Sequence, residues 1–221
     1  MVANSEQAAV VTTPEQRRVV LVGGGGHAAV CLDVLRAAGH EILGYIANDP
    51  SELDLVHLGD DSIINELSTT ECSIFVAVGD NKLRMRLIQN AARRGHRFAR
   101  AVSPNAVVSA SVTIGECSVI MPGVVINART TIGVGVIVNT SASIDHDGRV
   151  GDFAHIAPGC HLAGSVSVGS GAFLGVGVSV IPGRSIGDWA IVGAGAAVVT
   201  DIAPSVTAVG VPARPLIATA D

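Results

Sequence analysis

The chain has 221 residues with 26 glycines, four cysteines and 3% aromatic residues, and its formal net charge is −5 at pH 7. An acidic balance without a basic cluster argues against a nucleic-acid partner. The cysteines form no C-x-x-C pair, which argues against a zinc knuckle or a disulfide scaffold. A composition rich in Val, Ile, Ala and Gly suits a narrow, repetitive interior.

Residues 1–17 have neither a basic start nor an apolar core, so we expect a flexible tail rather than a signal peptide. The sequence has no run of about 18 or more apolar residues, free of glycine and polar breaks, that would span a bilayer. It therefore predicts a soluble cytoplasmic protein that has no membrane partner.

Residues 18–101 alternate strand and helix patterns. We expect strands at 19–22, 42–46 and 73–80, a helix that follows a glycine turn and ends near 38, and an amphipathic helix at 81–95. This order predicts a small Rossmann-like α/β domain with a parallel sheet. The segment is too short for a full two-lobed dinucleotide-binding domain.

From Val102 the period changes to six. Every sixth position from 102 to 198 is Val, Ile or Leu, seventeen times in succession, and the residue four places after each of these anchors is usually small. A unit of one short strand and one tight turn forms a wall of a triangular coil, so three units make a coil of 18 residues. Residues 102–203 therefore predict a parallel β-helix of five to six coils, followed by a C-terminal extension at 204–221.

One hexad of the repeat, Ile144 to Arg149, carries two carboxylates and an imidazole. Because Ile144 keeps the phase, His146 falls near a corner and outside the prism, where a core histidine is not expected. The residues alone leave three interpretations open: a solvated turn, a metal site, or a base with an acid beside it. An imidazole suits proton removal near neutral pH, and a carboxylate on its other nitrogen would fix its tautomer.

The loop from Gly23 to Ala28 formally fits the pattern G-x-G-x-x-[GA] after a strand and before a helix. An NAD-binding site also needs an acid at the end of the second strand, where Ala47 and Asn48 stand, although Asp49 is near. We favour a loop whose N–H groups and helix N-terminus bind the diphosphate of a nucleotide-sugar. An NAD-dependent oxidoreductase is the alternative.

The hexapeptide grammar resembles that of the left-handed β-helix acyltransferases, which use acetyl-CoA and assemble as trimers. Five segments resemble the nucleotide-amino-sugar N-acetyltransferases of the bacillosamine and perosamine type, which are related to sialic-acid O-acetyltransferases. The segments are VLVGGGGHAAVCLDVL, VAVGDNKLR, IVNTSASIDHDGRVGDFAHIAPG, FLGVGVSVIPG and VGVPARP. The resemblance extends over about residues 18–215.

This resemblance implies a homotrimer in which acetyl-CoA donates an acetyl group without a metal. The acceptor it implies is the amine of a 4-amino-4,6-dideoxy sugar on UDP or GDP, made for surface polysaccharide. O-acetylation of a sialic-acid type sugar is the runner-up. Because residue 47 is not an acid, the identity of the nucleobase in the nucleotide-sugar stays open.

The resemblance also assigns residues. It makes His146 the general base and Asp147 its partner, and it leaves Asp145 open. Gly164, one coil above His146, would offer its N–H to the oxyanion. The acetyl-CoA residues implied are His155, Gly164, Val176 and Ala194. The nucleotide-sugar residues implied are Gly25, Gly26, His27, Asn48, Asp49 and Gly79.

Two other classes of function remain as alternatives. His155 and His161 are six apart and share one hexad phase, which suggests the zinc site of the trimeric γ-carbonic anhydrases, although those pairs are spaced H-x4-H. A non-enzymatic binding module that uses the glycine loop as a sensor would not need His146 beside Asp147. We expect Cys160 to be buried and inert, so that transfer proceeds directly in a ternary complex.

Overall fold

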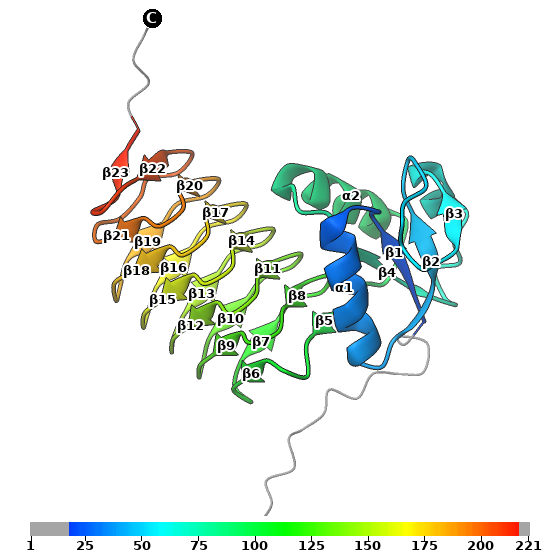
Figure 1. Cartoon of the computed structure of the whole chain (residues 1–221), viewed down its shortest axis with the longest axis horizontal. Helices are drawn as coiled ribbons and strands as arrows, with labels where there is room; N and C mark the ends of the chain where they lie inside the picture. Colours follow the sequence, from blue (N-terminus) through cyan, green and yellow to red (C-terminus); the bar gives the residue numbers. More distant parts are fainter. Residues whose placement is uncertain (1–17, 217–221) are drawn as a thin grey trace, which may run out of the picture.

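The computed structural model describes residues 18–216, so the predicted tail at 1–17 and residues 217–221 lie outside the described residues. The described chain folds into an α/β domain followed by a long β-helix (Figure 1). In this part of the chain no helix has the length and apolar character needed to cross a membrane.

The α/β domain is built on a parallel sheet with the order β3-β2-β1-β4. Its strands are β1 Arg18–Val22, β2 Glu41–Ile46, β3 His57–Gly59 and β4 Ser73–Val76, and its helices are α1 Gly26–Ala37, α2 Asn81–Arg93 and the 3-10 helix η2 Asp61–Asn65. The sequence did not predict β3 or η2. The last predicted strand was also too long, because residues 77–80 form the loop that leads into α2.

The first strand and its glycine turn fold as the sequence pattern indicates. β1 is buried from Val19 to Val22, as a central parallel strand covered on both faces should be. Gly23 follows at φ 127°, and a Cβ there would lie 2.6 Å from the carbonyl oxygen of Ala77. Only glycine fits this turn. α2 starts at Asp80, whose carboxylate accepts the N–H of Leu83 at 2.7 Å.

The β-helix consists of two-residue strands that each end on one of the hydrophobic anchors, which confirms the period of six. These strands are β5 Ala101–Val102, β6 Val107–Val108, β7 Thr113–Ile114, β8 Val119–Ile120, β9 Val125–Ile126, β10 Thr131–Ile132, β11 Ile137–Val138, β12 Ser143–Ile144, β13 Arg149–Val150, β14 His155–Ile156, β15 His161–Leu162, β16 Ser167–Val168, β17 Phe173–Leu174, β18 Ser179–Val180, β19 Ser185–Ile186, β20 Ile191–Val192 and β21 Ala197–Val198.

The strands stack into three parallel sheets, the walls of the prism, and each residue pairs with the one 18 positions away, as Ser143 does with His161. The 6-stranded sheet has the order β21-β18-β15-β12-β9-β6, and the 5-stranded sheet β19-β16-β13-β10-β7. The 8-stranded sheet runs from β5 to β20 and continues with β22 Thr207–Val209 and β23 Arg214–Pro215, which lie in the predicted C-terminal extension.

The corners of the prism have a regular backbone. The third residue after an anchor takes a left-handed conformation at every corner from Cys117 to Gly195. Glycine occupies about half of these positions, and Asp147 adopts the same conformation with φ 60°. This backbone fixes how Asp147 leaves its turn.

Helix α2 joins the two parts of the molecule (Figure 1). Asn81 donates its side-chain amide to the carbonyl of Gly171 at 3.1 Å, on a corner of the β-helix. One coil above Gly171, the ring of Trp189 lies 5.9 Å from the ammonium of Lys82. The deepest connection is made by Arg84, which is buried between α2 and two corners of the β-helix.

Candidate active site

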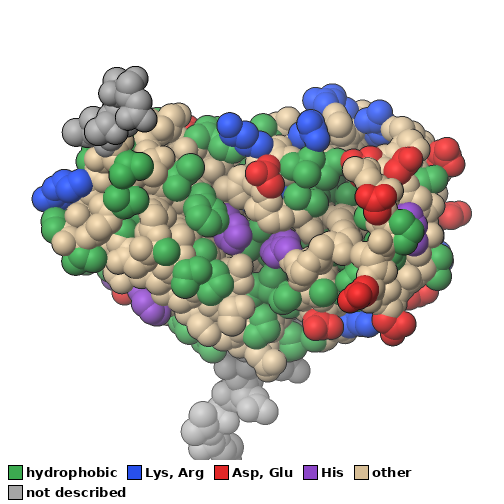
Figure 2. Space-filling model, turned by 45° about the horizontal axis from the view of Figure 1, so that its top comes forward, with side chains coloured by type: hydrophobic (Ala, Val, Ile, Leu, Met, Phe, Trp, Pro, Cys, Tyr) green, Lys and Arg blue, Asp and Glu red, His purple; other side chains and the backbone are tan. Residues whose placement is uncertain are grey.

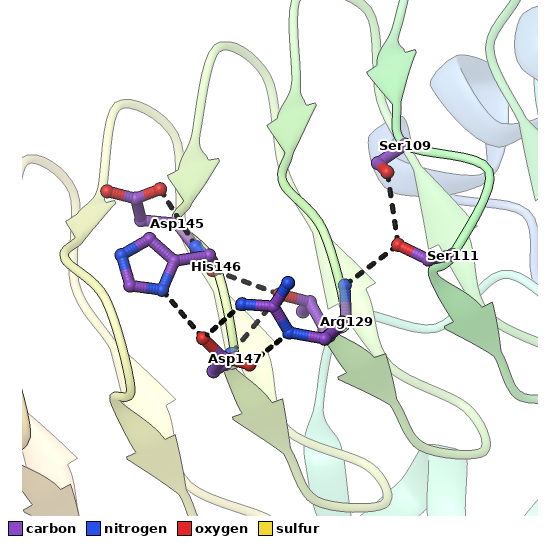
Figure 3. Close-up of polar contacts among 8 residues, drawn as sticks. Ser109, Ser111, Arg129, Asp145, His146 and Asp147 are labelled. Atoms are coloured by element: carbon purple, nitrogen blue, oxygen red, sulfur yellow. Dashed lines mark hydrogen bonds and ion pairs between the residues drawn. The ribbon is translucent and has the colours of Figure 1, made fainter.

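His146 lies at a corner between β12 and β13, with its side chain 55% exposed (Figure 3). Its Nδ1 lies 2.8 Å from Oδ2 of Asp147, the next residue. The other side of the ring faces Gly164, one coil above, where a Cβ would lie 2.6 Å from both Nε2 and Cε1. With Nδ1 engaged by the carboxylate, Nε2 is the nitrogen that can take a proton.

A second group holds Asp147 from the coil below. Arg129 donates Nε to Oδ1 at 2.7 Å and NH2 to Oδ2 at 2.8 Å, a two-pronged pair with the carboxylate. Hydrogen bonds from Arg129 and then from His146 hold the pKa of Asp147 well below its usual range. The carboxylate therefore stays charged throughout the range in which an imidazole titrates.

Asp145 faces away from this pair. Its Oδ1 accepts the backbone N–H of His146 at 2.8 Å and the side-chain amide of Asn127 at 2.9 Å. The hydrogen bond from the His146 backbone, and then that from Asn127, lowers the pKa of Asp145. Asp145 thus fixes the backbone of the turn, and its carboxylate makes no hydrogen bond to the imidazole.

The N–H of Gly164 is available for a ligand. At the equivalent place on three corners a carboxylate accepts the N–H: Asp152 from Val134 at 2.8 Å, Asp188 from Ser170 at 2.7 Å and Asp145 from His146 at 2.8 Å. Within residues 18–216 no acceptor is found for the N–H of Gly164. This donor lies beside the His146 ring, so the two groups suit a reaction in which a base and an oxyanion meet.

An open groove of about 470 Å³ runs along the outer face of the 6-stranded sheet, starting beside the His146 turn. Its lining mixes polar residues, including Asn127, Asp145, Ser143 and His161, with apolar residues that include Ile181 and Pro182. A groove of this kind suits a long, flexible ligand with amide groups.

A second cluster of polar side chains lies where the α/β domain meets the β-helix. The rings of His27 and His155 are 6.5 Å apart, and Phe173 presents its ring to His155 at 5.2 Å. Nδ2 of Asn139 lies 3.3 Å from Nε2 of His155. Figure 2 shows histidine side chains at the surface near the middle of this face, between the two parts of the molecule.

Both histidines of this cluster are held neutral. Burial, and then the charge of Arg84, lowers the pKa of His27 to about 4 and that of His155 to about 3. Neither imidazole takes up a proton near neutral pH, so each serves as a neutral hydrogen-bonding group.

Arg84 supports this cluster from below. Its guanidinium donates to the carbonyls of Gly135 at 2.7 Å and Phe153 at 2.8 Å in the β-helix, and to Val78 at 2.9 Å and Gly79 at 3.0 Å in the α/β domain. Burial lowers its pKa to about 10, so the group stays charged. A single side chain thus joins the loop after β4 to two corners of the β-helix, one of which directly precedes the strand of His155.

The predicted nucleotide-sugar residues gather at one edge of the parallel sheet, beyond the carboxyl ends of β1, β2 and β4. This edge is where open α/β sheets bind ligands. Gly25 and Gly26 are exposed and have open space where a Cβ would stand, while Asn48 and Asp49 are exposed and Gly79 is half-buried. The structure thus brings this predicted set together, with His27 at its inner side.

The predicted acetyl-CoA residues are not brought together within one chain. Val176 and Ala194 are exposed and stacked one coil apart, where Gly195 donates to the carbonyl of Val176 at 2.8 Å. That corner follows the 8-stranded sheet, whereas the His146 corner follows the 6-stranded one. Gly164 alone of this set contacts His146.

Cys160 is buried, and its Sγ donates to the carbonyl of Gly175 at 3.1 Å. Burial raises the pKa of this thiol, as expected for an inert cysteine. Within residues 18–216, no three side chains of His, Cys, Asp or Glu are grouped so that they could hold a metal ion.

Comparison with known proteins identifies the family. Residues 18–91 match the family model of the PglD N-terminal domain. The structure is similar to PerB from Caulobacter crescentus in complex with CoA and GDP-perosamine, with a TM-score of 0.87 and 48% identity over 90% of this chain and 96% of that one. The chain belongs to the acetyl-CoA-dependent sugar N-acetyltransferases. Their left-handed β-helix and the predicted α/β domain before it are confirmed as the fold.

One further structure agrees with this family of sugar N-acetyltransferases, and another shares its fold. The acetyltransferase domain of PglB from Neisseria gonorrhoeae, in complex with acetyl coenzyme A, is 35% identical with a TM-score of 0.87 over 91% of this chain and 100% of that one. WeeI from Acinetobacter baumannii, 23% identical with a TM-score of 0.81, covers 90% of this chain and 99% of that one, and shares the fold. The protein therefore transfers an acetyl group from acetyl-CoA to the amine of a nucleotide-linked sugar, as the sequence predicted.

Sequence analysis missed two arginines of these sites. Arg129 stands 18 residues before Asp147, so the coil length that stacks every residue on its neighbour would have placed the two together. Arg84 carries no such signal, because an arginine on an amphipathic helix usually faces water.

Proposed function

We propose that the acceptor is a GDP-linked 4-amino-4,6-dideoxy sugar of the perosamine type. The observation that carries this choice is the similarity, over nearly the whole chain, to an enzyme solved with GDP-perosamine. A UDP-linked sugar is the alternative. The glycine edge of the α/β domain, with Gly25, Gly26, His27 and Gly79, would hold the diphosphate, and the exposed Asn48 and Asp49 would lie toward the nucleoside.

In the proposed reaction the sugar amine attacks the thioester carbon and forms a tetrahedral intermediate. Nε2 of His146 takes the proton that the nitrogen loses, while Asp147 holds Nδ1–H and so maintains the tautomer. The N–H of Gly164 donates to the oxyanion. The carbon–sulfur bond then breaks, and the CoA thiolate leaves and takes up a proton.

We further propose that the enzyme works as a homotrimer in the cytoplasm, where nucleotide-sugars and acetyl-CoA are made. A single chain leaves His146 at a corner after the 6-stranded sheet, whereas His155, Val176 and Ala194 lie on or just after the 8-stranded sheet, so packing of copies would complete the acetyl-CoA site. Large apolar side chains on the β-helix surface support such packing. They include Val107, Val176, Ile181 and Ile191, each more than 40% exposed.

The test is an assay of the purified protein with acetyl-CoA and a panel of GDP-, UDP- and dTDP-linked 4-amino sugars. We expect CoA release to be fastest with the GDP sugar, and the product to show an amide by NMR rather than an ester. A higher kcat/KM with a UDP sugar would overturn the nucleotide assignment, and ester formation would overturn amine transfer. Light scattering of the same sample measures the oligomeric state.

A further inference from the structure

The carboxylate of Asp147 has two partners, and only one of them is the proposed base. Oδ2 lies 2.8 Å from Nδ1 of His146 and 2.8 Å from NH2 of Arg129, while Oδ1 accepts Nε of Arg129 at 2.7 Å (Figure 3). The same oxygen thus serves the imidazole and the guanidinium. The carboxylate of Asp147 therefore couples Arg129 to His146.

The position of Arg129 is itself fixed from the coil below. Its backbone N–H donates to Oγ of Ser111 at 2.9 Å, and Ser109 lies 3.2 Å from Ser111. Ser111, Arg129 and Asp147 are each 18 residues apart, so they form one column of the β-helix (Figure 3). The guanidinium is thus presented by rigid backbone even though its side chain is 65% exposed.

The charged groups around the imidazole are few. Within residues 18–216, those recorded in contact with the His146 turn are Asp147, Asp145 and, through Asp147, Arg129. Asp145 is occupied by the backbone N–H of His146 and by the amide of Asn127. The coil above contributes Gly164 and Ser165, which carry no charge, and the titratable ring of His161, which lines the same groove as Asp145 and has its Nδ1 2.8 Å from Oγ of Ser143.

The physical consequence concerns the protonation of the base. A carboxylate that faced only His146 would stabilise the imidazolium, and the imidazole would then be protonated over more of the neutral range. A proton acceptor must instead have its lone pair free. A guanidinium on the same carboxylate offsets part of its charge, and its planar fork holds Oδ2 in line with Nδ1.

We propose that Arg129 is a positioning residue for acetyl transfer, which neutralises part of the Asp147 charge and so lowers the pH above which His146 acts as a base. This inference rests on the proposed role of His146. It adds a third residue to the His146–Asp147 pair. Arg129 touches neither substrate and acts through the carboxylate of Asp147.

Two variants separate the charge of Arg129 from its shape. Arg129→Met removes both, so we expect the acid limb of the kcat/KM profile against pH to move to higher pH by about 0.5 to 1 unit. This corresponds to a roughly threefold to tenfold loss of kcat/KM on the acid side. Arg129→Lys keeps the charge without the fork, so its limb should stay within about 0.2 unit of wild type while the plateau falls by a few-fold.

A matched control and a second measurement make the test independent of folding. Arg149→Met removes an exposed arginine of β13 whose side chain makes no hydrogen bond or ion pair within residues 18–216, and its profile should equal that of wild type. The titration of the His146 ring can be followed by NMR in the protein as purified. Its midpoint should move to higher pH in Arg129→Met, and this measurement needs no turnover.

The results that overturn the inference differ from those that overturn the proposed function. An acid limb and a ring titration in Arg129→Met that both coincide with wild type would remove Arg129 from the mechanism and leave His146 as the base. Full activity in His146→Asn would instead remove the base assignment itself, whatever the behaviour of Arg129.

Discussion

The corner that carries His146 and the domain junction that holds His27 and His155 give the same side chain opposite surroundings. At the corner the imidazole is exposed and paired with a carboxylate, which a guanidinium also holds. At the domain junction burial, and then the charge of the buried guanidinium of Arg84, keeps both rings neutral. The first arrangement permits a histidine to gain and lose a proton during turnover, and the second prevents it.

The largest effect should come from exchanging the proposed base. His146→Asn removes the nitrogen that takes the proton, so kcat should fall by about 10² to 10⁴-fold with an unchanged melting temperature. The matched variant at the domain junction is His155→Asn. It should mainly raise KM for acetyl-CoA and lower kcat by at most about tenfold. Steady-state kinetics decide, and an equal loss of kcat in both variants would contradict the contrast between the two sites.

A smaller effect is expected from crowding the base. Gly164→Ala places a methyl group 2.6 Å from the His146 ring, so the exposed imidazole must turn away from its present position. We expect kcat to fall by about 10 to 10²-fold, because the proposed base and the proposed oxyanion donor lose their alignment. The neighbouring Ser165→Ala serves as the control and should keep wild-type kcat. Retention of full activity in Gly164→Ala would show that the present ring position is not the productive one.

The domain junction can be tested through Arg84, the side chain that joins the two domains. Arg84→Met leaves the carbonyls of Gly135, Phe153, Val78 and Gly79 without their donor, and should lower the free energy of unfolding by about 2 to 4 kcal/mol. Arg86→Met, two residues along the same helix and exposed, should change it by less than about 0.5 kcal/mol. Urea titration measures both, and equal stability of the two variants would mean that the guanidinium contributes little to domain docking.

The most gradual effect, spread over several pH units, is a pH dependence of stability. The pKa values of His27 and His155 fall from an ordinary 6.5 to about 4 and about 3 in the folded protein. Below pH 6.5 the unfolded chain binds these protons first, so acid favours unfolding down to those lower values. The free energy of unfolding should fall by at most about 1.4 kcal/mol per pH unit for each histidine. Replacing His155 by Asn should flatten this slope, and an unchanged slope would place His155 in solvent.

The β-helix was predictable because its rule is local and repeated. An inward anchor at every sixth residue fixes the strand, and the same count places His146 outside and Gly164 directly above it. The count also contained Arg129, 18 residues before Asp147, although no chemical pattern pointed to it. The proposed roles of these residues remain predictions that the variants above address.

The cluster of His27 and His155 at the domain junction could not be predicted from the sequence, because it depends on how the two domains pack. His27 and His155 are 128 residues apart in sequence, and nothing in either segment indicates the other. Arg84 lies on a helix that also carries arginines facing solvent, so only the docked β-helix reveals that its partners are backbone carbonyls. The short strand β3 was missed because three residues give no alternation to recognise.

Trp189 gives the protein a built-in optical probe. It is the one tryptophan in the sequence, and it stands at the junction, under the ammonium of Lys82 on α2. Its emission therefore reports on whether the two domains are apposed, without labelling and without interference from other indoles. A titration with nucleotide-sugar or acetyl-CoA that altered this emission would show which ligand changes the contact between α2 and the β-helix.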